Sequence, residues 1–170
     1  MEDKRVVKVN NQDIILDTSK LYFSENTLSE YLEKEGGWID YFGAKLADAE
    51  KQLAEIELKI DKQEAEYDKK YAQAFTHLKS TEGGSDKLTE GKAKLEPAVA
   101  DEEKNILEMK HELIEAKHIV RLLQQHLKAW QLNHENAQNR GNTLRREMDR
   151  LNKDVIYSGY DVEGIVKEVQ

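Results

Sequence analysis

The sequence contains no cysteine, only one proline and no long run of apolar residues. The lack of cysteine excludes disulfide scaffolds and thiolate metal sites, and it is typical of proteins in a reducing compartment. A helix that crosses a bilayer needs about 20 predominantly apolar residues, and no segment approaches that length. The N-terminal residues MEDKRVVKV also lack the apolar core of a signal peptide. The sequence therefore predicts a soluble, cytoplasmic protein that has no contact with a membrane.

Hydrophobic residues are also scarce, since they make up 38% of the 170 residues while charged residues make up 35%. This ratio disfavours a thick globular core. The apolar residues nevertheless recur at regular spacing, which predicts long amphipathic helices that are stabilised by packing against one another. The net charge of -8 argues against indiscriminate binding to nucleic acid, so contact with a polyanion would require a local basic patch.

Residues 1–16 are predicted to form a small β-hairpin or arm, because two β-branched runs flank Asn10 and Asn11, which tolerate left-handed backbone angles. A helical domain is expected over residues 17–157, followed by a flexible tail over 158–170. Glycines and the proline divide the helical domain into helices at about 18–35, 38–79 and 98–156, with a connector at 80–97.

The first of these helices is expected to end at Gly36 and Gly37. The connector has a length that suits a reversal of direction, so the two long helices should form an antiparallel hairpin. From Ile106 onward, apolar side chains occupy thirteen of fifteen positions of a heptad repeat, which keeps its phase across Gly141. The sequence therefore predicts an all-α fold, a long helical hairpin that resembles a coiled coil.

The apolar face of the last helix is wider than one neighbouring helix can cover. We therefore expect a homo-oligomer, the default for self-complementary helical surfaces. His134 in the heptad column is expected to fix the register as a buried histidine, although it could bind an anion if it opened to solvent. The predicted oligomer interface consists of Leu113, Val120, Leu127, Trp130, Leu144, Met148 and Leu151.

No phosphate-binding loop, nucleophile elbow or dinucleotide fingerprint occurs in the sequence. Glu108 with His111, and Glu115 with His118, have the spacing found in di-iron helices, but both histidines fall on the outward face of the predicted helix. They are more simply explained as solvated side chains. The sequence therefore predicts no catalytic residue, no metal site and no cofactor.

The segment KAWQLNHENAQNRGNTLRREM, residues 128–148, reverses the sign of the local charge. Arginine forks match phosphate oxygens, and Gly141 would allow a helix or a phosphate backbone to approach closely. His126 and His134 are able to add further charge, while Trp130 is expected to fill the helical seam rather than to stack on a base. In the alternative interpretation, the cations pair with acidic faces of neighbouring helices. The cations are Arg121, Lys128, Arg140, Arg145 and Arg146, against Glu135 alone.

These features resemble, in order and spacing, the UvsY family of phage recombination mediators. The resemblance spans about 17–155 and rests on the DTSKL stretch at 17–21, on Trp38 at the head of a long charged helix, on the glycine-rich connector and on the 128–148 segment. It implies a ring-shaped homo-oligomer, a hexamer or heptamer, that binds single-stranded DNA. Such a protein helps to displace single-strand-binding protein, loads a RecA-like recombinase and is not an enzyme. A phage-encoded member would act in the cytoplasm of the bacterial host.

The resemblance also indicates DNA-binding positions. Basic residues before a tyrosine late in the first long helix correspond to Lys69 and Lys70, with Lys62 earlier in that helix, and an Arg-Gly pair corresponds to Arg140 and Gly141. An alternative is a structural coiled-coil scaffold or assembly protein of a phage, in which the arginines serve only to pair subunits. The predicted DNA-binding residues are Lys62, Lys69, Lys70, Lys128, Arg140, Arg145 and Arg146.

Overall fold

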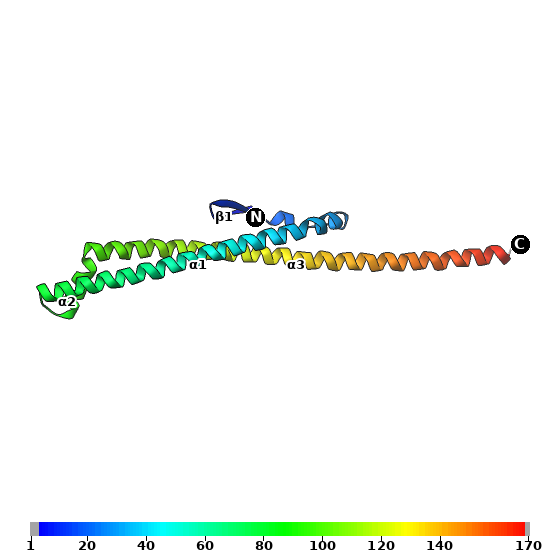
Figure 1. The fold of residues 1–170 in the computed structure, drawn as a ribbon. Helices are drawn as coiled ribbons and strands as arrows, with labels where there is room; N and C mark the ends of the chain where they lie inside the picture. Colours follow the sequence, from blue (N-terminus) through cyan, green and yellow to red (C-terminus); the bar gives the residue numbers. More distant parts are fainter. Residues whose placement is uncertain (1–3, 169–170) are drawn as a thin grey trace. The chain divides into compact units, whose positions relative to one another are not determined.

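The structure is a computed structural model that describes residues 4–168, with side chains described for residues 4–153. It is 85% helical and carries one short two-stranded antiparallel sheet, which confirms the predominantly helical fold predicted from the sequence (Figure 1). The chain divides into two compact units. The hairpin unit comprises Arg5–Leu16 and Gly43–Gln125, and the aromatic unit comprises Asp17–Phe42 with the chain from His126 onward.

The predicted N-terminal β-hairpin is present as β1 (Lys4–Val9) and β2 (Gln12–Asp17). Asn10 and Asn11 connect the strands with φ angles of 48° and 60°, the left-handed pair that a tight two-residue turn requires. The backbone N–H of Asn10 donates to Oε1 of Gln52 at 3.4 Å, which ties the turn to the first long helix. One face of the sheet is buried, through Val7, Val9, Ile14 and Leu16.

The segment after β2 differs from the predicted helix at 18–35, because it contains two 3₁₀ turns, η1 (Thr18–Leu21) and η2 (Glu25–Thr27). The carboxylate of Asp17 accepts hydrogen bonds from the backbone N–H and the hydroxyl of Ser19, at 3.1 and 2.5 Å. A short polar side chain that bonds to the nearby backbone in this way favours a tight turn over a regular helix. The first regular helix therefore begins only at Leu28.

Helix α1 (Leu28–Thr81) continues through Gly36 and Gly37, where the sequence predicted a helix end. Neither glycine has a positive φ angle. Each costs about 1 kcal/mol of helix propensity relative to alanine, which is less than packing of a buried side chain contributes. Leu28 and Phe42 are both buried on either side of the glycines, so the packing of this stretch keeps the helix continuous.

The predicted connector at 80–97 contains its own helix, α2 (Asp86–Leu95), after a break at Gly83 and Gly84. These two glycines have φ angles of 66° and 107°, which side chains rarely adopt, so the first long helix ends here.

Helix α3 (Pro97–Glu168) starts with the chain's proline in its first turn, where the missing N–H has no cost. It is continuous through Gly141, as predicted. The backbone remains helical beyond the predicted end at 156, as far as Glu168, because no proline interrupts the hydrogen bonds of the helix. The expected tail over 158–170 is therefore helical up to that residue, and 169–170 lie outside the described residues.

Polar contacts between α1 and α3 confirm their antiparallel arrangement in the hairpin unit. The contacts recur at steps of seven residues on both helices, in opposite directions, which is the heptad spacing of an antiparallel coiled coil. The contacting pairs are Glu50 with Gln124 at 3.3 Å, Glu57 with Lys117 at 3.3 Å and Glu64 with Lys110 at 2.7 Å.

Candidate nucleic-acid interface

The three lysines predicted to bind DNA on α1 have different surroundings. Lys62 is exposed, and Lys69 is exposed with Oε2 of Glu66 at 3.8 Å from its ammonium. Lys70 forms an ion pair with Glu102 of α3, and the hydrogen bond to that carboxylate raises the pKa of Lys70. Lys70 thus joins the two long helices, and Lys62 is the one of the three without a carboxylate partner among the described side chains.

The predicted cations of α3 are also divided. Arg140 forms an ion pair with Glu25, whose hydrogen bond raises the pKa of the guanidinium. Lys128, Arg145 and Arg146 are exposed, and no carboxylate lies within ion-pair distance of them in residues 4–153. These three cations remain accessible to a polyanion, whereas Arg140 already has a carboxylate partner within the chain.

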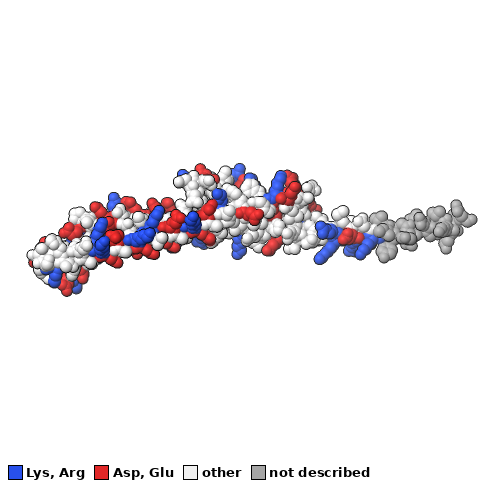
Figure 2. Space-filling view, in the orientation of Figure 1, with Lys and Arg blue, Asp and Glu red and all other residues white. Residues whose placement is uncertain are grey.

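The part of α3 that follows Gly141 forms a short surface that we call the basic overhang, residues 142–153. Gly141 lies opposite Leu28, the first residue of α1, because a Cβ atom added there would be 3.9 Å from Cδ2 of Leu28. Beyond this point α3 has no facing helix within the described part of the aromatic unit, and Figure 2 shows Lys and Arg side chains there, with Asp and Glu among them. The overhang carries the exposed cations Arg145, Arg146, Arg150 and Lys153, and the acids Glu147 and Asp149.

Two of these cations, Arg150 and Lys153, are absent from the residues predicted to bind DNA. Their spacing from Arg146, four and seven residues, places all three on one face of the helix. This i, i+4, i+7 pattern is visible in the sequence and could have identified them. The prediction considered only the segment that ends at residue 148, so it did not include them.

The predicted oligomer interface is corrected at two positions. Val120 and Trp130 are buried inside the chain, Trp130 with only 2% of its surface exposed, so they belong to the core of the chain itself. The reason is that α1 packs along this part of α3 and covers the heptad column. Leu113, Leu127 and Leu144 are half-buried. Met148 and Leu151 are each 63% exposed, because they lie in the basic overhang where α1 is missing.

His126 and His134, which were expected to add charge near the basic run, both pack or form polar contacts within the aromatic unit. His126 is buried, and burial lowers its pKa, so it is neutral at pH 7. Nδ1 of His134 lies 3.0 Å from Oε2 of Glu35, and Nε2 lies 2.7 Å from the side-chain nitrogen of Gln138. His134 thus joins α3 to α1, although it is half-buried rather than buried as predicted, and its role in register stays a prediction.

A cluster of aromatic rings surrounds Trp130. Its indole is nearly parallel to that of Trp38, with an interplanar angle of 16° and centroids 6.0 Å apart, and to the ring of Tyr31, at 14° and 6.2 Å. Phe42 packs edge-on against His126, with centroids 4.5 Å apart. The stacking of Trp38 on Trp130 was not predicted from the sequence, because it joins residues of two helices that are far apart in the chain.

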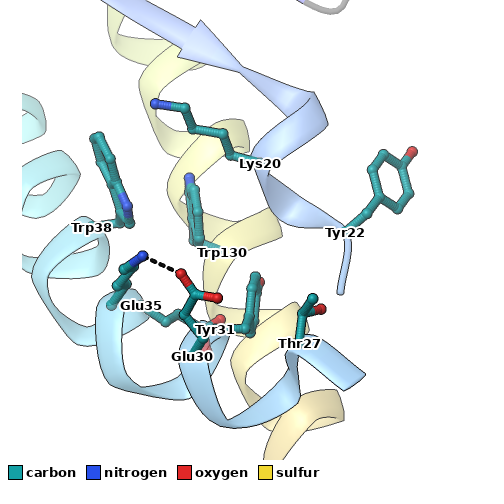
Figure 3. A pocket seen from close by; sticks show the side chains of 9 residues that line it. Lys20, Tyr22, Thr27, Glu30, Tyr31, Glu35, Trp38 and Trp130 are labelled. Carbon is teal, nitrogen blue, oxygen red and sulfur yellow. Dashed lines mark hydrogen bonds and ion pairs between the residues drawn. The ribbon is translucent and has the colours of Figure 1, made fainter. Parts of the chain in front are cut away.

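A pocket of about 400 Å³ opens beside this cluster. Trp38 and Trp130 form part of its wall, with the Lys20 side chain above them (Figure 3). The ammonium of Lys20 lies 4.6 Å from the ring centroid of Trp38, a cation–π contact. Glu35 also lines the pocket, and its side chain is completely buried.

Taken together, the described side chains offer cations, apolar surface and stacked aromatic rings, which are means of binding. They contain no group of three or more residues arranged to hold a metal ion. Among the described residues, no helix combines the length and apolar character that a bilayer crossing requires. Comparisons of the chain with protein-family models, curated proteins and solved structures found no match.

Proposed function

We propose that this protein binds single-stranded DNA as a homo-oligomer and acts as a recombination mediator, loading a RecA-like recombinase in place of single-strand-binding protein. The observation that carries the proposal is the basic overhang. It presents four exposed cations without ion-pair partners in residues 4–153, on a chain whose net charge is -8. An acidic protein that keeps such a segment exposed has a surface suited to a polyanion.

The contrast with the hairpin unit supports this interpretation. There, Lys110 and Lys117 each pair with a glutamate of α1, although other lysines of that unit, such as Lys62, have no carboxylate partner among the described side chains. In the overhang, Arg146, Arg150 and Lys153 share a helical face and repel one another. A phosphate backbone relieves that repulsion and releases its own counterions on binding, which drives association.

The apolar residues of the overhang support self-association. Leu144, Met148 and Leu151 follow the spacing i, i+4, i+7 and share a second face of the same segment, and the last two are exposed. Burial of this face against further copies would gather several overhangs. A modest contact in each subunit would then become strong binding to one continuous strand.

The mediator step follows from the resemblance of residues 17–155 to the UvsY family. It extends the proposal to a hexameric or heptameric ring, to displacement of single-strand-binding protein and to loading of the recombinase. The proposed role consists of binding single-stranded DNA and loading the recombinase on it, so it assigns no catalytic residue, metal or cofactor to the chain.

A second candidate is a structural coiled-coil protein of a phage, without a nucleic-acid role. It is favoured by Lys70 and Arg140, which pair with Glu102 and Glu25 as structural cations do. In that case, the cations of the overhang would contact acidic surfaces of neighbouring subunits.

Fluorescence anisotropy of labelled oligo(dT), measured between about 50 and 200 mM salt, separates the two candidates. A mediator should bind at low salt, with log K falling against log salt by about 0.7 for each phosphate neutralised. A structural protein should give no change in anisotropy even at the lowest salt. For the mediator step, addition of the protein should shorten the lag before a RecA-like recombinase hydrolyses ATP on DNA coated with single-strand-binding protein.

A further inference from the structure

One carboxylate oxygen in the pocket of the aromatic unit has no hydrogen-bond partner. Glu35 is completely buried, and its Oε2 lies 3.0 Å from Nδ1 of His134. Its Oε1 is also buried and makes no hydrogen bond to the described chain. Burial and the neighbouring Glu35 carboxylate raise the pKa of Tyr31, so this hydroxyl lies close to Glu35, but it donates to the carbonyl of Leu21, at 3.2 Å. Because nearly all buried polar atoms in folded proteins are paired, this oxygen is an acceptor for a donor from outside the chain, either a water molecule or a ligand.

The walls of the pocket are suited to a flat aromatic ligand. Trp38 is half-buried and presents part of its indole to the pocket, while the parallel Trp130 supports it from within the core. Tyr22 stands at the rim with 82% of its surface exposed and points away from the indoles (Figure 3). The volume of about 400 Å³ lies in the range of small-molecule pockets and exceeds that of a single base, so it leaves room for a sugar.

We propose that this pocket binds one base of single-stranded DNA and prefers a base that carries an exocyclic amino group. The inference rests on the proposed function, since it names a base-binding position within the same DNA-binding protein. The base stacks on Trp38, and its amino group donates a hydrogen bond to Oε1 of Glu35. The ammonium of Lys20 leaves the indole face and contacts the phosphate of the same nucleotide.

The preference follows from the chemistry of a carboxylate, which only accepts hydrogen bonds. Cytosine, adenine and guanine each present an amino group, and acidic side chains bind cytosine in this way. On its Watson–Crick edge, thymine has a single N–H, which lies between two carbonyl oxygens that the carboxylate of Glu35 would repel. A cationic side chain from a protein partner fits less well, because the ammonium of Lys20 already lies 4.6 Å from Trp38 and would repel it.

The test compares labelled oligo(dT) with the same oligonucleotide carrying one central cytosine. The wild-type protein should bind the cytosine form roughly tenfold more tightly, the effect of one hydrogen bond to a charged group. Glu35→Met has a similar length and no carboxylate, and it should remove the preference, so that the two oligonucleotides bind equally. Glu33→Met, at an exposed position of the same helix, is the matched control and should keep the preference.

A second measurement compares two nucleotides on the wild-type protein. Deoxycytidine monophosphate should quench the tryptophan fluorescence of the wild-type protein, and thymidine monophosphate should quench it far less. Lys20→Ala should weaken binding of deoxycytidine monophosphate but not of deoxycytidine, because only the monophosphate reaches the ammonium.

The outcomes separate this inference from the proposed function. Equal binding of the two oligonucleotides by the wild-type protein overturns the base pocket and leaves DNA binding intact. Failure to bind any oligonucleotide overturns both. Quenching by an arginine-containing peptide, without quenching by deoxycytidine monophosphate, also overturns the inference, because the pocket would then hold a cation.

Discussion

The indole N–H of Trp130 donates a hydrogen bond to Nε2 of His126 at 3.0 Å, one turn away on α3, and both side chains are buried. The imidazole therefore accepts at Nε2 and carries its proton at Nδ1. Burial lowers the pKa of His126, and the carboxylate of Asp17 opposes this shift only in part. His126 is thus a neutral core residue that positions the central tryptophan.

This relationship predicts how stability depends on pH. Above the unfolded pKa of 6.5, both states are neutral at His126 and the residue adds no dependence on pH. As the pH falls below 6.5, the unfolded chain takes up a proton that the buried imidazole resists, so stability should fall. His126→Gln should flatten the urea-unfolding free energy between about pH 5 and 7 relative to the wild type. His118→Gln, at an exposed position, should leave the wild-type dependence unchanged.

Gly141 predicts a stabilising substitution. A Cβ atom there would meet only Cδ2 of Leu28, at 3.9 Å, which is an ordinary contact. Gly141→Ala should therefore raise stability by about 1 kcal/mol, or about 2–4 °C in Tm, through helix propensity. Thermal unfolding by circular dichroism measures the change. A loss of stability would contradict the packing described for Leu28, and a loss of oligo(dT) binding alone would mean that Gly141 serves the approach of DNA.

The ion pairs between α1 and α3 in the hairpin unit predict that one charge reversal restores the stability lost through another. Glu57→Lys should place two lysines opposite each other, because Lys117 lies 3.3 Å from Glu57, and should destabilise the protein by up to about 1 kcal/mol. Combination with Lys117→Glu restores the pair in the reverse order and should recover most of the loss. Glu55→Lys makes the same charge change at an exposed position without an ion pair, and Lys117→Glu should not rescue it. Equal rescue of both variants would mean that net charge, rather than the antiparallel register, is responsible.

The exposed apolar face of the basic overhang predicts a separation of assembly from folding. Met148→Asp with Leu151→Asp should dissociate the oligomer in analytical ultracentrifugation, since a charge at a buried interface is costly. The Tm of the subunit at low concentration should change little, because both side chains are 63% exposed within the chain. Leu58→Asp with Leu107→Asp alters two other exposed leucines outside the overhang and should leave the assembly intact. An assembly that survives the first pair of substitutions would contradict the proposed interface.

Heptad spacing predicted much of the helical architecture. Leu123, Trp130 and Ala137 follow one another at heptad spacing and are all buried, and Pro97 begins the last helix as its backbone constraints require. Predictions from local sequence rules failed where the free energy of packing outweighs helix propensity. Gly36 and Gly37 read as a helix end in isolation, but contacts of Leu28 and Phe42 with the rest of the aromatic unit hold the helix together. Such contacts join residues that are far apart in sequence, so spacing alone does not reveal them.

The candidate sites were predictable only in part. The cations of 128–148 are evident from composition, but their partners are not, because Glu25 and Glu102 meet Arg140 and Lys70 only through the fold. The pocket at Glu35 was missed altogether. In the sequence Glu35 is one of many acids on a charged helix, and its burial depends on how Trp38 and Trp130 stack.

The most direct test of the central claim is the salt dependence of oligo(dT) binding by Arg145→Ala with Arg146→Ala. The account predicts weaker binding, with the slope of log K against log salt reduced by about 1.4, since each lost phosphate contact removes about 0.7. Lys87→Ala with Lys94→Ala removes the same charge from exposed positions of α2 and should leave the slope unchanged. An unchanged slope in the arginine variant, or an equal reduction in the lysine variant, would contradict the assignment of the basic overhang as the DNA-binding surface.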